Sequence, residues 1–233
     1  MSAKKEEQRK HKEQKQAAAI RKQHQRSLLV KGGLILLIPL VLYVFLQGLF
    51  TGASSLPPDV VSDADHVRGN PDAALTLTVY ADFQCPACRT ETAVISQAWP
   101  QISDKVKLVF RHYPLDTHRH AFLAARYAEA AGRQNKFWEM HDVLYANQVV
   151  WSGEADATGL FDGYAQELGL DLAQLKADVD VTAVRNKIVA DQRGGDRAGV
   201  RATPSLFFNG RLVSNPPSAT DLVQRVNRAL AEN

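Results

Sequence analysis

The amino-acid sequence predicts an α/β fold preceded by one N-terminal transmembrane helix. Two β-prone stretches enclose a predicted helix that begins at a Cys-x-x-Cys motif, which is the pattern of a βαβ unit. A long block of helical periodicity follows, and after it an Asn-Gly turn between two short β-prone runs predicts a hairpin. The strands of one sheet are therefore expected to be separated in the sequence by a helical insertion.

Residues 1–31 form a basic tail that holds ten Lys and Arg against three Glu, a net charge of +7. The remainder carries 18 basic and 22 acidic residues, so the overall charge of +3 combines two regions of opposite sign. The tail contains no aromatic residue to stack on bases, and we therefore expect no nucleic-acid partner. We expect it to orient the chain in a membrane, with anionic lipid as an additional contact.

Residues 32–50 are 19 consecutive uncharged residues, close to the roughly 20 that span the hydrocarbon core of a bilayer. Pro39 is tolerated in membrane helices, and Phe50 approaches the far interface, where aromatic side chains collect. Because Lys and Arg precede this segment, the positive-inside rule predicts a single-pass protein of the cell membrane with a cytoplasmic N-terminus and an extracytoplasmic catalytic domain. A cleaved signal peptide is the alternative, since residues 51–53 are small, but the apolar run exceeds the usual length.

Residues 51–58 contain small residues and two prolines, and they are predicted to link the membrane segment to the following domain. Residues 59–233 have ordinary single-domain length and enough Leu, Val, Phe and Ala to bury a core without disulfide staples. We expect this domain to be a monomer.

The first strand of the domain is predicted at residues 75–80, where Leu and Val alternate with Thr, and it leads directly into the Cys-x-x-Cys motif at 85–88. Pro86 suits the first turn of a helix, which is predicted to stop before Pro100. Residues 106–110 form the second predicted strand. A helix between two such strands implies a right-handed connection and parallel pairing.

The helical insertion is predicted at about residues 116–195. Apolar side chains recur there at helical spacing in roughly four segments, and Gly194 and Gly195 are expected to end the last of them. Phe137, Trp138 and Met140 are interpreted as core residues of this block, because aromatic residues at helical spacing are mainly buried.

The chain is predicted to close with a hairpin and a helix. Residues 205–208 and 211–213 are β-prone, and the Asn209-Gly210 dipeptide between them is a strong hairpin signal. The last helix is predicted to begin at Ser218, whose Ser-x-x-Asp spacing resembles a capping box.

Cys85 and Cys88 are the only cysteines of the sequence. A disulfide framework needs more cysteines and a closed zinc site needs two more good ligands, so the spacing favours reversible dithiol/disulfide chemistry. Cys85 falls at the amino end of the predicted helix, where unpaired N–H groups and the helix dipole lower a thiol pKa from about 8.5 and favour the attacking thiolate. Cys88 lies one turn further on and can resolve a mixed disulfide by intramolecular attack.

Four stretches of the domain, in this order, resemble a membrane-anchored, DsbA-like member of the thioredoxin-fold disulfide oxidoreductases. They are Asp82-Phe83-Gln84-Cys85-Pro86-Ala87-Cys88, Phe110-Arg111-His112-Tyr113-Pro114-Leu115, Lys136-Phe137-Trp138-Glu139-Met140-His141-Asp142 and Ala202-Thr203-Pro204-Ser205-Leu206-Phe207-Phe208-Asn209-Gly210. The resemblance implies a thioredoxin fold interrupted by a helical insertion domain. It further implies Cys85 as the exposed nucleophile, Cys88 as its buried partner, and Pro204 in the cis form beside them. The redox-active disulfide Cys85–Cys88 would serve without any other cofactor.

Three residues beside the cysteines, Asp82, Ala87 and Thr203, are expected to support them in addition to Pro86 and Pro204. Relatives that oxidise strongly carry His where this chain has Ala87, so Ala87 predicts a milder oxidant. Asp82 could relay protons to Cys88, but a carboxylate at a strand end more often caps the next turn, and we favour the cap. Thr203 either tunes the redox potential by a hydrogen bond or acts only as a β-prone residue.

The histidines invite a metal hypothesis, which we do not favour. His112, His118 and His120 could in principle join the two cysteines in a soft-metal site. A single Cys-x-x-Cys pair is a poor match to structural zinc spacing, however, and His118 or His120 is better explained as the start of a helix.

The sequence therefore predicts an extracytoplasmic thiol-disulfide oxidoreductase that introduces disulfides into reduced exported polypeptides and is reoxidised by a membrane redox partner. A disulfide reductase or isomerase fed with electrons across the membrane is the first alternative, because motif spacing does not fix the direction of electron flow. The second is a non-catalytic, anchored module that binds peptides as a chaperone.

Overall fold

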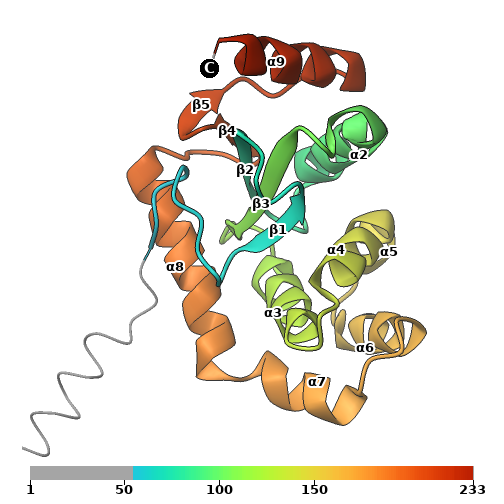
Figure 1. Ribbon diagram of the computed structural model, residues 1–233. Helices are drawn as coiled ribbons and strands as arrows, with labels where there is room; N and C mark the ends of the chain where they lie inside the picture. Colours follow the sequence, from blue (N-terminus) through green and yellow to red (C-terminus); the bar gives the residue numbers. More distant parts are fainter. Residues whose placement is uncertain (1–54, 233) are drawn as a thin grey trace, which may run out of the picture. The chain divides into compact units, whose positions relative to one another are not determined.

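This computed structural model describes residues 55–232, which form a five-stranded sheet with helices on both faces (Figure 1). The strand order is β1-β3-β2-β4-β5; β2 and β3 are parallel and the other neighbours are antiparallel. The predicted α/β fold is confirmed. The elements in chain order are β1 (His66–Gly69), β2 (Leu75–Ala81), α2 (Pro86–Ile102), β3 (Val106–His112), α3 (Ala121–Gly132), α4 (Phe137–Ala146), α5 (Gln148–Trp151), α6 (Thr158–Glu167), α7 (Leu172–Val179), α8 (Thr182–Ala198), β4 (Ser205–Phe208), β5 (Arg211–Val213) and α9 (Ala219–Ala231).

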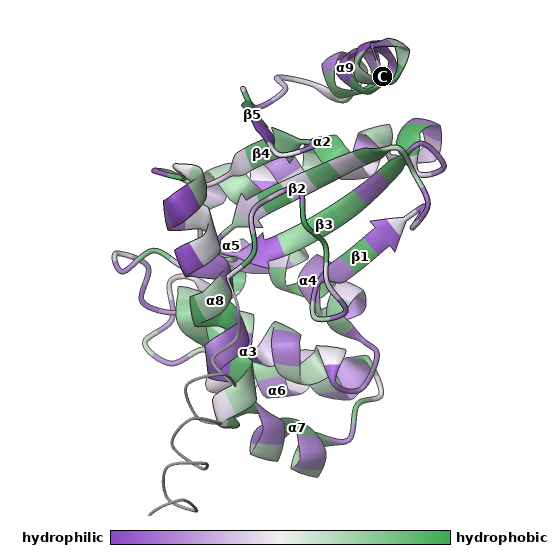
Figure 2. Cartoon of the chain, turned by 60° about the vertical axis from the view of Figure 1, so that its left-hand side comes forward, coloured by the Kyte–Doolittle hydropathy of each residue, from purple (hydrophilic) through white to green (hydrophobic). Residues whose placement is uncertain are grey.

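The main core lies on the face of the sheet that α2, α4 and α9 cover. Parallel pairing places Leu77 beside Leu108 and Val79 beside Phe110, so these apolar side chains project to the same side of β2 and β3. α9 packs against α2. Figure 2 shows that α9 contains both hydrophobic and hydrophilic residues. The same core continues into the helical insertion, whose buried apolar side chains belong to it.

The opposite face of the sheet is covered by α8 and by the segment that precedes β1. Tyr80, Tyr113 and Phe207 form a second, smaller cluster there. Thr78 Oγ1 donates a hydrogen bond of 2.7 Å to the carbonyl of Pro58, so residues at the end of the predicted linker pack against the sheet. The part of the linker that the structure describes, residues 55–58, is thus attached to the domain.

The insertion between β3 and β4 contains more helices than the sequence indicates. Within the described residues it comprises α3 to α8, where we predicted roughly four segments. The additional boundaries are short: α5 has only four residues, and α7 and α8 are separated by Asp180 and by Val181, which is extended. A break of one or two residues between helices hardly changes the helical spacing of apolar residues, so the sequence does not reveal it.

Gly194 and Gly195 lie inside a helix, contrary to the prediction that they end one. α8 continues to Ala198 and ends at Gly199, which has a left-handed φ of 86°. A Cβ on Gly194 would lie 2.8 Å from the carbonyl oxygen of Leu56, and one on Gly195 would lie 2.8 Å from the ring of Tyr113. These glycines therefore permit close packing of α8 instead of terminating it.

The prediction that the first helix stops before Pro100 is also wrong, because α2 continues to Ile102. Proline removes the hydrogen bond that its nitrogen would donate to the carbonyl four residues earlier, at Ser96. Ser96 and Pro100 are both on the exposed side of α2, so water can bond to that carbonyl.

β1 was not predicted. It is a four-residue antiparallel edge strand beside β3 with Val67 as its one apolar side chain, so no alternation of apolar residues marks it.

The N-terminal predictions concern residues that the structure does not describe. Among residues 55–232, none of the helices is long and apolar enough to cross a membrane. The predicted tail at 1–31 and the predicted transmembrane segment at 32–50 lie outside the described residues.

Candidate active site

Cys85 lies at the amino end of α2, immediately after the turn that follows β2. It is the N-cap residue of the helix, with extended backbone angles, and Pro86 occupies the first turn. The Cys85 backbone N–H donates to the carbonyl of Asp82, and its own carbonyl accepts from the N–H of Arg89. The sulfur is therefore attached where the unpaired N–H groups of the helix begin.

Cys85 is less accessible than the resemblance implied. The residue is only 7% exposed and Cys88 1% exposed, although Pro86 and Ala87 between them are exposed. Cys85 Sγ donates to the carbonyl of Thr203 at 3.4 Å, so the loop before β4 covers one side of the sulfur. Access to Cys85 is consequently narrow, and Cys88 is fully enclosed.

The two thiols have opposite acid strengths. A hydrogen bond from the Cys88 thiol lowers the pKa of Cys85 to about 5; burial opposes this shift, and the Thr203 side chain and the backbone N–H groups of Cys88 and Ala87 add to it. Burial raises the pKa of Cys88 far above its usual value, and the hydrogen bond with Cys85 raises it further. Near neutral pH, reduced Cys85 is thus a thiolate and Cys88 a thiol.

Asp82 is fully buried beside the motif and caps the turn before Cys85. Its Oδ1 accepts from the backbone N–H of Gln84 at 2.7 Å, and its Oδ2 accepts from the N–H of Leu115 at 2.9 Å. His118 Nδ1 lies 2.7 Å from the same Oδ2. The Asp82 backbone N–H donates to Cys88 Sγ at 3.4 Å. Asp82 therefore caps the turn, as we favoured. Its carboxylate is bonded to Gln84, Leu115 and His118, not to Cys88.

The Thr203–Pro204 peptide bond is cis, as the resemblance implied. It brings the Thr203 carbonyl against Cys85 from a part of the chain more than a hundred residues away. Pro204 also borders a groove of about 360 Å³ whose lining includes exposed Leu212 of the edge strand β5. Cys85, Cys88, Asp82, Thr203 and Pro204 thus converge at one end of the sheet, as the sequence predicted.

Sequence reasoning missed the helical insertion's contact with the motif. The buried amide of Gln148, the first residue of α5, donates to the carbonyl of Phe83 at 2.7 Å and to that of Cys85 at 2.9 Å. Tyr145 OH of α4 donates to the carbonyl of Asp82 at 3.3 Å. No sequence motif marks Gln148, although the apolar Val149, Val150 and Trp151 after it are a weak signal that it lies near the core.

The three histidines of the metal hypothesis point to different partners. His118 pairs with Asp82, His120 Nε2 lies 2.8 Å from the carbonyl of Glu154, and His112 Nε2 lies 2.8 Å from Glu129 Oε1. His120 is also the N-cap residue of α3, which fits the expectation that it begins a helix. The arrangement gives these histidines structural partners away from the cysteines.

Three kinds of similarity to known proteins agree with this geometry. A family model described as thioredoxin matches residues 61–228. Among solved structures, a thioredoxin-like oxidoreductase from Silicibacter pomeroyi DSS-3 is 30% identical, with 73% of this chain and 94% of that chain covered and a TM-score of 0.63. BdbD from Bacillus subtilis is 20% identical, with 76% and 99% covered and a TM-score of 0.65, a likeness that concerns the fold. The fold of alpha-DsbA1 from Wolbachia pipientis is similar as well, at 19% identity, 74% and 96% coverage and a TM-score of 0.62.

The curated relatives are much longer proteins. The Na(+)/H(+) antiporter NhaA 1 of Mycolicibacterium gilvum (strain PYR-GCK) is 38% identical over 167 residues, which is 70% of this chain and 26% of the antiporter. That of Salinispora arenicola (strain CNS-205) is 39% identical over 167 residues, 71% of this chain and 25% of the antiporter. The match thus spans about a quarter of these relatives.

Proposed function

Because this chain belongs to the thioredoxin family and has the fold of its DsbA-like thiol-disulfide oxidoreductases, we propose that it introduces disulfides into reduced polypeptides outside the cytoplasm through the Cys85–Cys88 couple. The observation that carries the proposal is the contrast between the two sulfurs. Cys85 is stabilised as a thiolate, with a pKa lowered to about 5, whereas burial keeps Cys88 protonated. When the reduced form of such a couple is stabilised in this way, its disulfide is a good acceptor of electrons.

The reaction begins with the Cys85–Cys88 disulfide. A substrate thiolate attacks Sγ of Cys85, which forms a mixed disulfide and expels Cys88 as the leaving sulfur; Cys88 then takes up a proton. A second substrate thiolate attacks the substrate sulfur of the mixed disulfide. This step forms the substrate disulfide and releases Cys85 as a thiolate, and its low pKa makes it a good leaving group.

The surroundings of Cys85 suit a polypeptide substrate. The sulfur lies beside the Thr203 carbonyl, and the groove that starts at Pro204 follows the edge strand β5. An extended chain can add to such an edge through backbone hydrogen bonds, and exposed Leu212 offers an apolar contact.

The location and the recycling partner are part of the proposal and rest on the sequence. The uncharged run at 32–50 after a basic tail favours a membrane anchor with the domain outside, where the environment is oxidising. A membrane redox partner would then take two electrons from Cys85 and Cys88 and restore the disulfide, and Cys88 would lose its proton in that step. The antiporter activity of the curated relatives is not proposed here, because the match covers about a quarter of those proteins.

Trapping of mixed disulfides tests the proposal. In Cys88→Ser the Cys85 thiolate can still attack a substrate disulfide and form a mixed disulfide, with the other substrate sulfur as the leaving thiolate. The variant lacks the Cys88 sulfur that would attack Cys85 Sγ and release the substrate, so exported polypeptides should accumulate as covalent adducts that a reductant releases. The matched control, Cys85→Ser, should trap none. If neither variant forms adducts and Cys85→Ser keeps full function in cells, the domain is a non-catalytic binding module and the proposal fails.

A further inference from the structure

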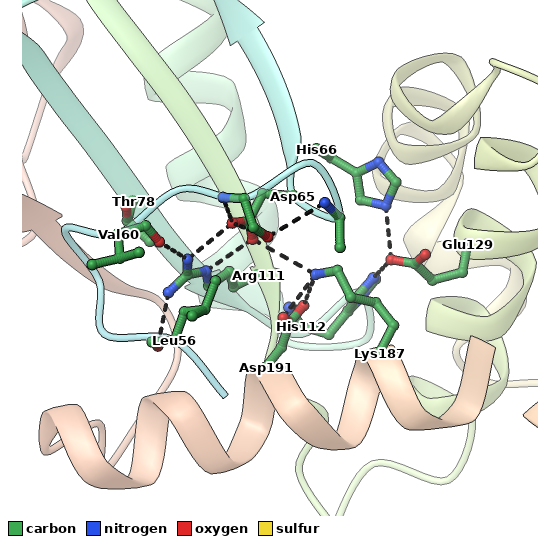
Figure 3. A network of polar contacts seen from close by, with 12 residues as sticks. Leu56, Val60, Asp65, His66, Thr78, Arg111, His112, Glu129, Lys187 and Asp191 are labelled. Carbon is green, nitrogen blue, oxygen red and sulfur yellow. Dashed lines mark hydrogen bonds and ion pairs between the residues drawn. The ribbon is translucent and has the colours of Figure 1, made fainter. Parts of the chain in front are cut away.

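A network of buried charged side chains joins β1 and the end of β3 to α3 and α8 (Figure 3). Asp65 receives hydrogen bonds from Arg111 Nε at 3.1 Å and Nη2 at 3.0 Å. Both carboxylate oxygens of Asp191 lie 2.7 Å from Lys187 Nζ. Each of these two buried carboxylates therefore has a permanent cation bonded to it.

Glu129 is the third buried carboxylate of this network, and its partners are different. Its Oε1 lies 2.8 Å from Nε2 of His66 and 2.8 Å from Nε2 of His112, and among the described residues no Lys or Arg forms an ion pair with it. Lys187 acts on Glu129 only at longer range, because its Nζ is engaged by Asp191. A buried anion needs a counter-charge, and among the described residues no permanently charged side chain is bonded to Glu129.

The two imidazole rings are fixed in place by separate parts of the fold. His66 projects from β1 and stacks on Phe137, with ring centroids 3.4 Å apart and an angle of 3° between planes. His112 ends β3 and is 1% exposed, and its Nδ1 has no hydrogen-bond partner among the described residues.

The donor atoms have the spacing of a metal site. One ligand atom from each of His66, His112 and Glu129 lies within 4.8 Å of the other two. Ligands of a zinc ion lie about 2.0–2.2 Å from the metal and hence up to about 4 Å from one another, so side-chain shifts of less than about 1 Å would accommodate an ion. Two imidazoles and a carboxylate are the donors that Zn²⁺ accepts in proteins.

We propose that His66, His112 and Glu129 bind one divalent transition-metal ion, Zn²⁺ being the ion that best fits the donors, and that this ion clamps β1 and β3 to α3. It supplies the positive charge that Glu129 lacks. Because the three ligands come from the sheet and from the first helix of the insertion, the clamp ties the two parts of the domain together.

The test is a zinc titration of the purified full-length chain with the Cys85–Cys88 disulfide formed, so that the thiols cannot bind the metal. We expect one equivalent of Zn²⁺ to bind and to raise the unfolding temperature, and Co²⁺ in its place to give the visible absorption of a four-coordinate site. His66→Gln and His112→Gln should each weaken binding by at least about 100-fold. The matched control, His118→Gln, changes a histidine outside the cluster and should bind as tightly as the parent chain.

Two results would overturn the proposal. One is a parent chain that binds no more Zn²⁺ than His66→Gln does, in which case a proton held within the three residues supplies the counter-charge. The other is binding that His118→Gln weakens as much as His66→Gln does. If His112→Gln fails to fold, His66→Gln at the partly exposed edge strand decides the question by itself. The outcome is independent of the redox function, because it is read from metal binding and unfolding alone.

Discussion

Cys85 and Cys88 have the same side chain, and their different positions on α2 give them different chemistry. Cys85 is the N-cap residue and receives hydrogen bonds from the Cys88 thiol and from backbone N–H groups at the start of the helix. Cys88 is one turn further along and is enclosed by the core. Cys85 therefore acts as the reactive sulfur and Cys88 as the resolving sulfur because they lie one helical turn apart.

The acid strength of Cys85 gives the first prediction. Alkylation of the reduced protein at Cys85 should follow a titration with its midpoint at about pH 5, since the pKa is lowered to about 5. In Cys88→Ala the midpoint should move upward, because the largest cause of the lowered pKa, the hydrogen bond from the Cys88 thiol, is removed. The rate of iodoacetamide labelling against pH measures both midpoints. A midpoint near the free-thiol value of about 8.5 in the parent chain would contradict the account.

Asp82 gives the second prediction, at the turn before the motif. Asp82→Ala should lower the free energy of unfolding by about 3 kcal/mol, because the N–H groups of Gln84 and Leu115 lose their acceptor and each unsatisfied buried group costs about 1–3 kcal/mol. Urea denaturation measures the change. The control Asp72→Ala alters an exposed carboxylate and should stay within about 0.5 kcal/mol of the parent chain. Equal effects in the two variants would show that the cap is unimportant.

At the scale of single residues, the sequence was informative where chemistry restricts the choice of residue. Two isolated cysteines with a proline between them indicated both the reaction and the helix start, and Asp82 was correctly favoured as a cap. The partners of these groups could not be foreseen. Only the tertiary fold brings His118 to Asp82 and Gln148 to the carbonyls of Phe83 and Cys85. The residues next to them in the sequence do not indicate these buried hydrogen bonds.

Among the elements, α5 is the shortest helix of the insertion, and it holds the redox motif through Gln148. Gln148→Leu should lower the free energy of unfolding by about 1–3 kcal/mol, since the buried carbonyl of Phe83 loses its donor and that of Cys85 loses one of two. Val149→Ala changes the neighbouring residue, whose side chain is 67% exposed, and should have an effect of at most about 0.5 kcal/mol. Denaturant unfolding of both variants measures the difference. A Gln148→Leu protein as stable as Val149→Ala would contradict this role.

The close packing of α8 on the sheet predicts opposite effects on stability for two glycine substitutions. Gly195→Ala should destabilise the fold by about 1–3 kcal/mol, because the added methyl group would lie 2.8 Å from the ring of Tyr113 and 3.0 Å from that of Tyr80. Gly163→Ala, inside α6, meets no atom within 4 Å and should stabilise the fold by up to about 1 kcal/mol through helix propensity. Thermal unfolding distinguishes the two signs. Stabilisation by both substitutions would refute the close approach of α8.

The same glycines explain what could be predicted at the scale of elements. β2, β3, the hairpin and α9 have patterns that local physics dictates, namely alternating apolar residues, an Asn-Gly turn and a Ser cap. Gly194, Gly195 and Pro100 are local helix-ending signals that did not end a helix. The two glycines lie inside α8 because the helix packs closely there, and α2 continues past Pro100 because water can donate a hydrogen bond to the Ser96 carbonyl. β1 has no apolar period, so only its pairing with β3 identifies it as a strand.

For the molecule as a whole, the low pKa of Cys85 links redox state to stability. In the unfolded chain a cysteine has a pKa of about 8.5, whereas in the folded reduced protein that of Cys85 is about 5. A group whose pKa is depressed by folding stabilises the folded state fully above the unfolded pKa, and this stabilisation is lost as the pH falls through the folded pKa. The disulfide form has no such group.

The stability gained by reduction should therefore depend on pH. We expect the difference in free energy of unfolding between reduced and oxidised protein to increase as the pH rises from about 5 to about 7.5, because Cys88 is protonated in the folded and unfolded reduced protein over this range and the remaining groups titrate alike in both forms. Denaturant unfolding of the two redox forms at several pH values measures it. A difference that is constant over this range would contradict the stabilised thiolate.

The membrane anchor and the direction of electron flow are properties of the whole molecule. The fold of residues 55–232 alone does not determine either of them. The family and the dithiol follow from the sequence pattern and the comparisons, but a thioredoxin fold serves oxidases, reductases and isomerases alike. What separates these functions is the relative stability of dithiol and disulfide.

The reduction potential of the Cys85–Cys88 couple, measured by equilibration in glutathione buffers, therefore tests the central claim most directly. Stabilisation of the Cys85 thiolate predicts a value well above about −180 mV, in the range of proteins that donate disulfides. A value near about −270 mV, that of a thioredoxin-like reductant, would contradict the account and assign the chain to disulfide reduction.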